Sequence, residues 1–356
     1  MKTLEDTGHC DTARVVGIDI GGANLKVSDL LGNAASQFFP MWSDSDRLCD
    51  ALADMLVPFE FSSLAVTMTG ELADCFFDRR EGVSKIVDSA VAASKRFNAD
   101  VCFYTVEGEF VGCSAAKQNP DAVAASNWHA SAKCIAEEYF GNDIASSHAA
   151  SSGAVDDAMV VDVGSTTTDI VPIKAGKVAT ASCTDFDRLV EGSLVYLGCG
   201  RTPVCSLVSS LRFRGRNVRV MNEVFATMDD VMLILGKNSE DAQDCQSADQ
   251  RPRTIEMAAN RMARMIGLDH RRVDISLARD LSAQVMTAAQ HEVQLAFDGI
   301  DNGGTIVMIG HGGELLCVPA DRDVLRLDQI FNAEVSRCFP AYAVGVLLAN
   351  TIGSRA

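Results

Sequence analysis

Basic residues are scarce in this chain. Of its 356 residues, 31 are Lys or Arg and 48 are Asp or Glu, so the formal net charge is -17. Binding to the phosphate backbone of a nucleic acid needs a basic footprint, and so does binding to an anionic membrane surface. The charge balance therefore argues against both, and we expect neither a nucleic-acid partner nor a membrane partner.

Long apolar runs and paired metal ligands are also missing. No uninterrupted apolar stretch reaches about 18 residues, the length that a membrane-spanning helix needs. The first 14 residues lack the basic start and apolar middle of a signal peptide. The 12 cysteines form no C-x-x-C pair, and the 6 histidines show no metal-ligand spacing. We expect a cytoplasmic protein with reduced, mostly buried thiols and no zinc site.

What the chain does contain is typical of a globular enzyme-sized protein. Apolar residues make up 47% and charged residues 22%, and the length suits two domains. Short β-branched runs alternate with segments of helical periodicity, which predicts an α/β fold. Strands are predicted at 15–20, 25–30, 64–68, 101–106, 159–163, 168–173 and 305–309, and helices at 44–57, 82–97, 120–140, 185–197, 222–235, 253–266, 281–297 and 340–352.

An internal repeat is the most informative feature. Asp19–Val27 can be laid over Asp162–Ile170, which begins 143 residues later (162 minus 19). Each copy has an aspartate at the end of an apolar strand, then a glycine-led turn of small residues and a second strand. Such a turn lets backbone N–H groups converge on an anion, and the aspartate can hold a hydrated magnesium ion.

Two related copies suggest two related domains that bind a phosphate chain. The predicted magnesium ligands are Asp19 and Asp162. The predicted phosphate-binding residues are Gly21, Gly22, Asn24 and Lys26 in the first copy and Gly164, Ser165, Thr166 and Thr167 in the second.

A third glycine-rich loop follows the predicted strand 305–309. It contains Gly310, Gly312 and Gly313, where backbone could pack against a nucleotide or another substrate. Taken alone, it is read more simply as a glycine turn.

These three segments, in this order, resemble the phosphate-1, phosphate-2 and adenosine motifs of the actin, Hsp70 and sugar-kinase superfamily. The resemblance implies two ribonuclease-H-like domains with a phosphorylated ligand in the cleft between them. We place the first domain at 1–153 plus 335–356 and the second at 154–334. The third motif departs from the usual pattern, because no long helix follows its glycines before Pro319.

A narrower resemblance extends over nearly the whole chain. The sequence is similar to the hydantoinase/oxoprolinase-like proteins of tetrahydromethanopterin-linked one-carbon transfer, and among them to the members that act in methanofuran biosynthesis. The segments that carry the resemblance are Thr67–Phe76, Arg80–Val83, Ala125–Trp128, Arg201–Cys205 and Met221–Thr227. Those members join an aminomethyl-furan methanol diphosphate to the phenolic oxygen of a γ-glutamyl-tyramine, so that diphosphate leaves and an aryl ether forms.

The resemblance implies a magnesium-dependent transferase, for which the residues suggest roles. A phenol with a pKa near ~10 needs a base. Glu71 is the candidate, equally well read as a helix-start carboxylate, and Asp169 is the second candidate. Asp162 would act through the magnesium ion. Arg201, Asn127 and Arg80 are candidates for contacts with the substrate, although Arg80 also suits a plain surface charge.

Two other readings stay open. The same turns would serve an ATP-dependent small-molecule kinase or an ATP-driven cyclic-amide hydrolase, which both need an adenosine site. They would also serve a non-catalytic nucleotide switch, although the chain leaves little room for the extra domain of a chaperone. The sequence leaves open a role for ATP, the tyramine or tyrosine form of the acceptor, and whether the protein is a homo-oligomer.

Overall fold

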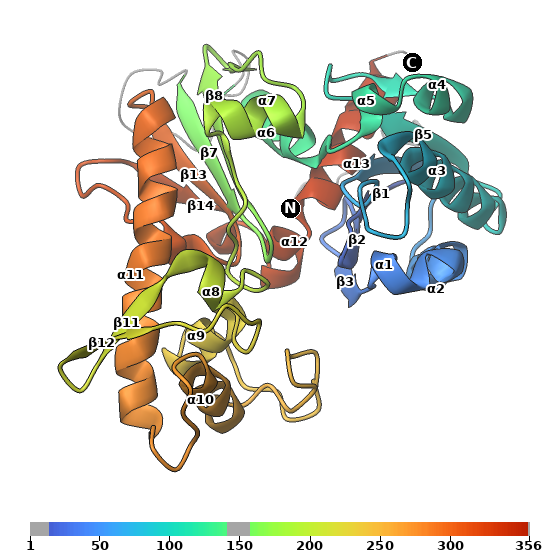
Figure 1. Ribbon diagram of the computed structural model, residues 1–356. Coiled ribbons are helices and arrows are strands. Elements are labelled where there is room, and N and C mark those ends of the chain that lie inside the picture. Colours follow the sequence, from blue (N-terminus) through green and yellow to red (C-terminus); the bar gives the residue numbers. More distant parts are fainter. Residues whose placement is uncertain (1–13, 141–156, 355–356) are drawn as a thin grey trace, which may run out of the picture. The chain divides into compact units, whose positions relative to one another are not determined.

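The computed structural model of the chain describes residues 14–140 and 157–354 (Figure 1). Within these ranges, no helix is long and apolar enough to cross a membrane. The chain divides into two compact units, which are described separately. The first contains Met1–Asp157, Ile173–Asp187 and Arg326–Ala356, and the second contains Ala158–Pro172 and Arg188–Leu325.

The first unit is built on a mixed sheet of six strands in the order β3-β2-β1-β4-β5-β6. The first three strands form an antiparallel meander, and β4 and β5 continue the sheet parallel to β1. The strands are β1 (Val15–Ile20), β2 (Asn24–Asp29), β3 (Ala34–Phe38), β4 (Ser63–Met68), β5 (Asp100–Tyr104) and β6 (Phe110–Val111).

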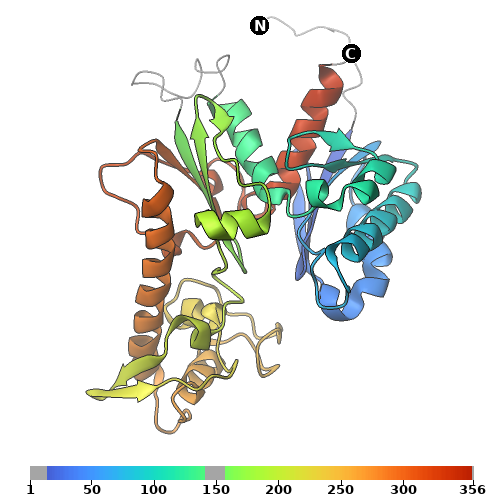
Figure 2. The same ribbon diagram turned by 45° about the horizontal axis from the view of Figure 1, so that its top comes forward.

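Helices cover both faces of this sheet (Figure 2). On one face α13 (Phe339–Gly353) packs against β1, β2 and β4 with α6 (Asn127–Tyr139) beside it. A Cβ atom on Gly17 would lie 1.8 Å from the carbonyl oxygen of Ala341, so glycine is what lets α13 lie directly on β1. The remaining helices are α1 (Met41–Asp44), α2 (Leu48–Leu56), α3 (Arg79–Lys95), α4 (Cys113–Gln118), α5 (Pro120–Val123) and α12 (Ala333–Arg337).

The second unit repeats this plan. Its sheet has the order β10-β8-β7-β13-β14, with β9 pairing β8, and β13 runs parallel to β7 as β4 runs parallel to β1. The predicted fold class is confirmed: both units are α/β and of the ribonuclease-H-like type. The strands are β7 (Ala158–Val163), β8 (Thr168–Lys174), β9 (Lys177–Val178), β10 (Leu194–Val195), β13 (Thr305–Gly310) and β14 (Val324–Arg326).

A mostly helical segment lies between β10 and β13. Helix α11, of 26 residues, is long enough to span about 39 Å at 1.5 Å per residue. It packs against α9, α10 and the small hairpin β11–β12 (Figure 1). The elements here are α8 (Val204–Leu207), β11 (Ser210–Phe213), β12 (Arg216–Arg219), α9 (Met228–Ile234), α10 (Ile255–Arg264) and α11 (Ile275–Ile300), whereas α7 (Asp185–Glu191) precedes β10.

Several predicted boundaries were wrong for identifiable reasons. The predicted helix 185–197 ends at Glu191, because Gly192 has φ +88° and the chain then pairs as β10. Helix α9 begins six residues later than predicted, where Thr227 and Asp230 form a reciprocal cap. Helix α11 begins earlier than predicted because the Asp274 side chain caps it.

The polar stretch 236–252 contains no helix or named strand, and a buried arginine of α10 holds it in place. Arg261 of α10 is fully buried and donates from Nε to Asp230 at 2.8 Å and from Nη1 to Asp249 at 3.0 Å. Arg264, one turn further along and 30% exposed, contacts the other oxygen of Asp249 at 3.0 Å.

We expect Arg261→Ala to lower the free energy of unfolding by about 3–5 kcal/mol, because it leaves a buried carboxylate without its partner. Arg264→Ala is the matched control and should cost under about 1 kcal/mol, since its ion pair is partly exposed. Urea denaturation measures both. Equal losses in the two variants would contradict the role given to burial.

Candidate functional site

The first glycine turn joins β1 to β2 and leaves backbone donors available. The N–H of Gly21 donates to the carbonyl of Asn24 at 3.0 Å and closes the turn. Among the described residues, the N–H groups of Gly22 and Ala23 have no acceptor. Next to the turn, Lys26 Nζ lies 3.4 Å from the buried carboxylate of Asp19, its partner across the two strands. The turn therefore offers two N–H groups and a nearby ammonium to an anion.

The loop after β4 lies directly against this turn. The N–H groups of Thr69 and Gly70 both donate to the carbonyl of Ile20, at 2.9 and 3.1 Å. A Cβ atom on Gly70 would lie 3.0 Å from the carbonyl carbon of Gly21, so any larger residue would push the turn away. Glu71 follows immediately and is thereby held close to the first turn.

Glu71 is the most unusual titratable group of the first unit. It is 1% exposed, and its Oε2 atom has no hydrogen-bond partner among the described residues. Burial raises the pKa of its carboxyl, and the charge of Asp185 adds to this rise. Backbone hydrogen bonds, one of them from Ala125, and the nearby Arg79 oppose the rise, and the net effect is an increase of the pKa from 4.5 to about 7. The result is a carboxyl group that exchanges its proton near neutral pH.

This pKa predicts how stability depends on pH. Between about pH 4.5 and 7 the folded chain holds a proton that the unfolded chain has released, so stability falls as pH rises through this window. Glu71→Gln removes that slope. We expect the variant to match the parent protein near pH 4.5 and to be more stable by about 3 kcal/mol at pH 8. Urea denaturation at the two pH values tests this, and a constant difference would contradict it.

Two segments named for the family resemblance meet around Glu71. A Cβ atom on Gly82 would lie 1.9 Å from the carbonyl oxygen of Glu71, so α3 packs tightly on this residue. From another direction, Ser126 Oγ lies 2.8 Å from Thr67 Oγ1, both of them buried, and fixes the loop before α6. In that loop Ala125 has φ +46°, a conformation that costs free energy in a non-glycine residue.

The second glycine turn, between β7 and β8, is closed in the same way. The N–H of Gly164 donates to the carbonyl of Thr167 at 3.0 Å. Within the described part of the chain, the N–H groups of Ser165, Thr166 and Thr167 have no acceptor. Three available N–H donors on a turn of small residues are the kind of group that binds phosphate oxygens.

Two further loops pack on this second turn. The N–H groups of Gly200 and Arg201 donate to the carbonyl of Ser165 at 3.0 and 2.7 Å, which places the exposed Arg201 at its edge. The predicted third loop reaches it as well, because a Cβ on Gly310 would lie 2.9 Å from Asp162 Oδ1. Gly310, Gly312 and the second turn therefore belong to one cluster within the second unit.

The repeat extends beyond the two turns. The N–H groups of His311 and Gly312 donate to the carbonyl of Val163 at 3.2 and 3.3 Å. Val163 occupies the place in the second unit that Ile20 has in the first, where Thr69 and Gly70 make the same two bonds. By this correspondence, Glu71 of the first unit matches Gly313 of the second.

Comparison with known proteins gives this geometry a context. A model of the hydantoinase/oxoprolinase family matches residues 63–352. The chain belongs to the hydantoinase/oxoprolinase family. It is 34% identical over 341 residues, 94% of this chain and 97% of the relative, to a Methanocaldococcus jannaschii protein. That relative is named (4-{4-[2-(gamma-L-glutamylamino)ethyl]phenoxymethyl}furan-2-yl)methanamine synthase.

Two more distant matches complete the comparison. A Methanococcus vannielii protein of the same name is 28% identical over 210 residues, which cover 55% of this chain and 93% of that protein. The crystal structure of a ROK family glucokinase from Streptomyces griseus, with glucose and AMPPNP, superposes with a TM-score of 0.43 at 14% identity. It covers 94% of this chain and 98% of the glucokinase.

Of the two aspartates predicted to hold magnesium, Asp162 suits the ion better than Asp19. Asp162 is half-buried at the carboxyl end of β7, beside the three N–H donors of the second turn. Asp19 is 2% exposed and already faces Lys26. No group of three or more His, Cys, Asp or Glu residues in the described ranges could hold a metal ion. Magnesium that keeps several waters needs only one or two carboxylates plus substrate phosphates, so Asp162 fits.

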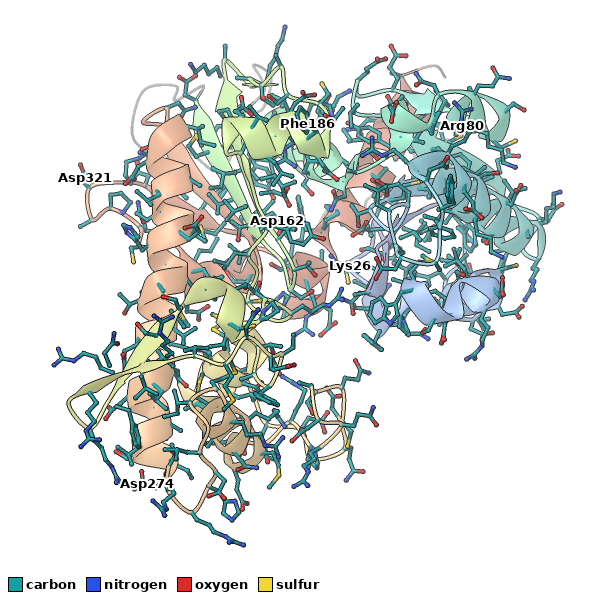
Figure 3. All side chains as sticks on the ribbon, in the orientation of Figure 1. Lys26, Arg80, Asp162, Phe186, Asp274 and Asp321 are labelled. Atoms are coloured by element: carbon teal, nitrogen blue, oxygen red, sulfur yellow. The ribbon has the colours of Figure 1, made fainter. Side chains whose placement is uncertain are left out.

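The other predicted site residues fall in different places. Asp169 accepts a 2.7 Å hydrogen bond from the buried Arg188, which also binds the carbonyl of Ser193, so this pair ties α7 to β8 and β10. Arg80 is exposed on the first turn of α3 (Figure 3). Asn127 is half-buried as the first residue of α6. Sequence analysis assigned no role to Arg79 or Asp185, and only the fold brings these two charges close enough to affect Glu71. It also assigned no role to Gly70, which precedes Glu71 and packs on the first turn.

Proposed function

We propose that the protein is a methanofuran-biosynthesis synthase that forms an aryl ether. It would condense an aminomethyl-furan methanol diphosphate with the phenol of a γ-glutamyl-tyramine or γ-glutamyl-tyrosine and release diphosphate. The observation that carries the proposal is the similarity to the Methanocaldococcus jannaschii synthase over 94% of the chain, which includes both turns and Glu71. The buried carboxyl of Glu71, whose pKa is raised to about 7, supports the proposal.

The bond changes define what the residues must do. The phenolic oxygen bonds to the furan methylene carbon while the bond from that carbon to the diphosphate oxygen breaks. The electron pair of the broken bond leaves on the diphosphate, and the phenolic proton passes to a base. The furan ring stabilises positive charge on the methylene carbon, so the largest demand is to stabilise the charge on the departing diphosphate.

The turns and Lys26 would meet that demand. Each turn is closed by its own hydrogen bond, so the N–H groups of Gly22 and Ala23 in the first turn and of residues 165–167 in the second would receive phosphate oxygens without rearrangement within that turn. Magnesium, when bound through Asp162, would neutralise charge on the diphosphate. Arg201 would contribute a fixed cation at the edge of the second turn.

Glu71 would accept the phenolic proton. An ordinary glutamate is a weak base for a phenol of pKa ~10, and a pKa near 7 improves the match while most of the group is still ionised above neutral pH. Ser126 and Thr67 would act as positioning residues, because their hydrogen bond fixes the loop that donates to the carboxylate.

The decisive experiment supplies purified protein with magnesium, the furan diphosphate and either acceptor, without ATP. Acceptor-dependent diphosphate release together with a product of the ether's mass is the expected result. Absence of product, followed by ADP formation once ATP is added with the acceptor, would overturn the proposal. That outcome would favour the kinase or ATP-hydrolase reading and an adenosine role for Gly310, Gly312 and Gly313.

A further inference from the structure

A small hairpin in the second unit concentrates positive charge on an acidic chain. Strands β11 and β12 and their two-residue turn carry four arginines within ten residues, and residues 207–222 contain no Asp or Glu. The chain as a whole has a net charge of -17. The four arginines are Arg212, Arg214, Arg216 and Arg219.

None of these four arginines forms an ion pair with a carboxylate in the described ranges. Some other guanidinium groups of the chain do form such pairs, as in Arg253 with Asp229 and Arg261 with Asp230. No carboxylate in the described ranges therefore neutralises the positive charge of the hairpin.

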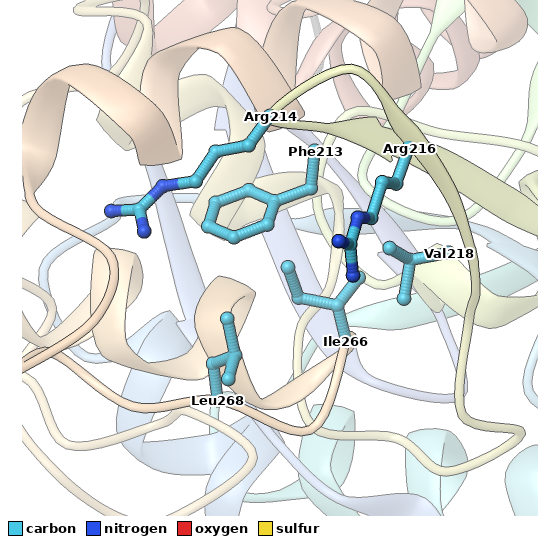
Figure 4. A pocket seen from close by; sticks show the side chains of 6 residues that line it. All are labelled: Phe213, Arg214, Arg216, Val218, Ile266 and Leu268. Carbon is cyan, nitrogen blue, oxygen red and sulfur yellow. The ribbon is translucent and has the colours of Figure 1, made fainter.

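A pocket of about 490 Å³ lies under this hairpin (Figure 4). Its volume is in the range of about 300–1,000 Å³ that is usual for small-molecule sites. Four apolar residues and two arginines line it, and no acidic residue does. Figure 4 shows the ring of Phe213 between the side chains of Arg214 and Arg216, with Ile266 and Leu268 below it and Val218 beyond Arg216. The lining residues are Phe213, Arg214, Arg216, Val218, Ile266 and Leu268.

The walls of the pocket are fixed before any ligand binds. The side chain of Gln284 on α11 binds both backbone groups of Arg212, at 2.7 and 3.0 Å, as a neighbouring strand would. The floor belongs to the segment that follows α10, where Ile266 is 8% exposed and part of the core. Arg214, with φ +49°, and Gly215 form the turn that carries the two arginines.

We propose that this pocket binds a small aromatic anion. The ring of the ligand would pack against Phe213, over which the Arg214 guanidinium lies 5.2 Å from the ring centroid, and against Val218 and Leu268. Its carboxylate or phosphate would receive charge-assisted hydrogen bonds from Arg214 and Arg216. The pocket shares no residue with the two glycine turns or with Glu71, so this inference does not rest on the proposed function.

Ligand-observed NMR on the full chain can test separately whether the aromatic ring and the anionic group of the ligand are needed for binding. The probes are 4-hydroxyphenylacetate and phenyl phosphate, which each combine an aromatic ring with an anion, a carboxylate in the first and a phosphate in the second. Tyramine supplies the ring without the anion, and acetate and inorganic phosphate supply the anion without the ring. We expect at least one aromatic anion to bind with a Kd of about 1 mM or lower, and all three control molecules to bind at least about tenfold more weakly.

Matched arginine variants locate the binding. Arg214→Gln and Arg216→Gln should each weaken binding by about tenfold or more, because each removes a charged hydrogen bond. Arg212→Gln and Arg219→Gln make the same charge change on the same hairpin outside the pocket, and should stay within about twofold. Thermal melting checks that all four variants fold.

Three results would overturn the proposal. They are the absence of aromatic-anion binding up to 10-fold above the expected Kd, equal losses in all four variants, and unchanged binding in both pocket variants. Equal losses would indicate attraction to the overall charge of the hairpin instead of a built site.

Discussion

Glu71→Gln is expected to reduce kcat for ether formation by about 10²–10⁴-fold, the range typical for loss of a general base. The amide has nearly the shape of the acid but cannot accept the phenolic proton. The KM for the furan diphosphate should change little, because the glutamine leaves the turn donors of Gly22 and Ala23 in place. Steady-state assays of diphosphate release measure both quantities.

The pH profile makes this first prediction specific. In the parent protein kcat/KM should rise with pH and level off above about pH 7, where Glu71 has lost its proton. That inflection should be absent in Glu71→Gln. Glu107→Gln, at an exposed position of the same unit, is the matched control and should keep both the rate and the profile. A Glu71→Gln enzyme with normal rate and an unchanged inflection would exclude Glu71 as the base.

Asp162→Asn is expected to reduce turnover by about 10²–10³-fold or more, the effect of losing one major contributor to transition-state charge stabilisation. The asparagine keeps the size of the side chain but loses the negative charge that a magnesium ion would neutralise. Because Asp162 is half-buried at a strand end, the fold should survive. Circular dichroism and thermal melting check this.

A magnesium titration separates this role from a purely structural one. If Asp162 holds the ion, the variant should need a higher magnesium concentration for half-maximal activity than the parent protein. Asp169→Asn is the contrasting variant, because it breaks the ion pair with the buried Arg188. It should lower the free energy of unfolding and leave the magnesium requirement unchanged. Normal activity and an unchanged magnesium requirement in Asp162→Asn would contradict the assignment.

Local sequence patterns predicted the elements that carry the turns, because β1, β7 and β13 are apolar runs bounded by glycine. Patterns failed where a tertiary partner decides the structure. The alternating residues of β11–β12 become a hairpin that Gln284 fastens from 72 residues away, and Leu194–Val195 pair with β8 instead of continuing a helix. Two signals were readable and were missed, namely Gly192 after α7 and Asp274 before α11.

The candidate site shows the same division. Glu71 was a candidate from its position after a strand, but its raised pKa depends on burial and on the charge of Asp185, while Arg79 opposes the rise. Asp185 is distant in sequence, and no spacing connects it to Glu71. The packing of Gly70 on the first turn likewise follows from the parallel pairing of β4 with β1, which single-sequence periodicity does not specify.

The matching hydrogen bonds around Ile20 and Val163 bear on how the two halves have diverged. If they descend from one ancestral half, selection has retained the backbone scaffold of each turn and altered what stands next to it. After the matching pair of donors, the first half has Glu71 and the second half has Gly313. After a duplication, one copy could have acquired a side chain that accepts a proton, while the other kept a glycine without a side chain at the same position. Reconstructed ancestors with the same residue at both positions would show which state came first.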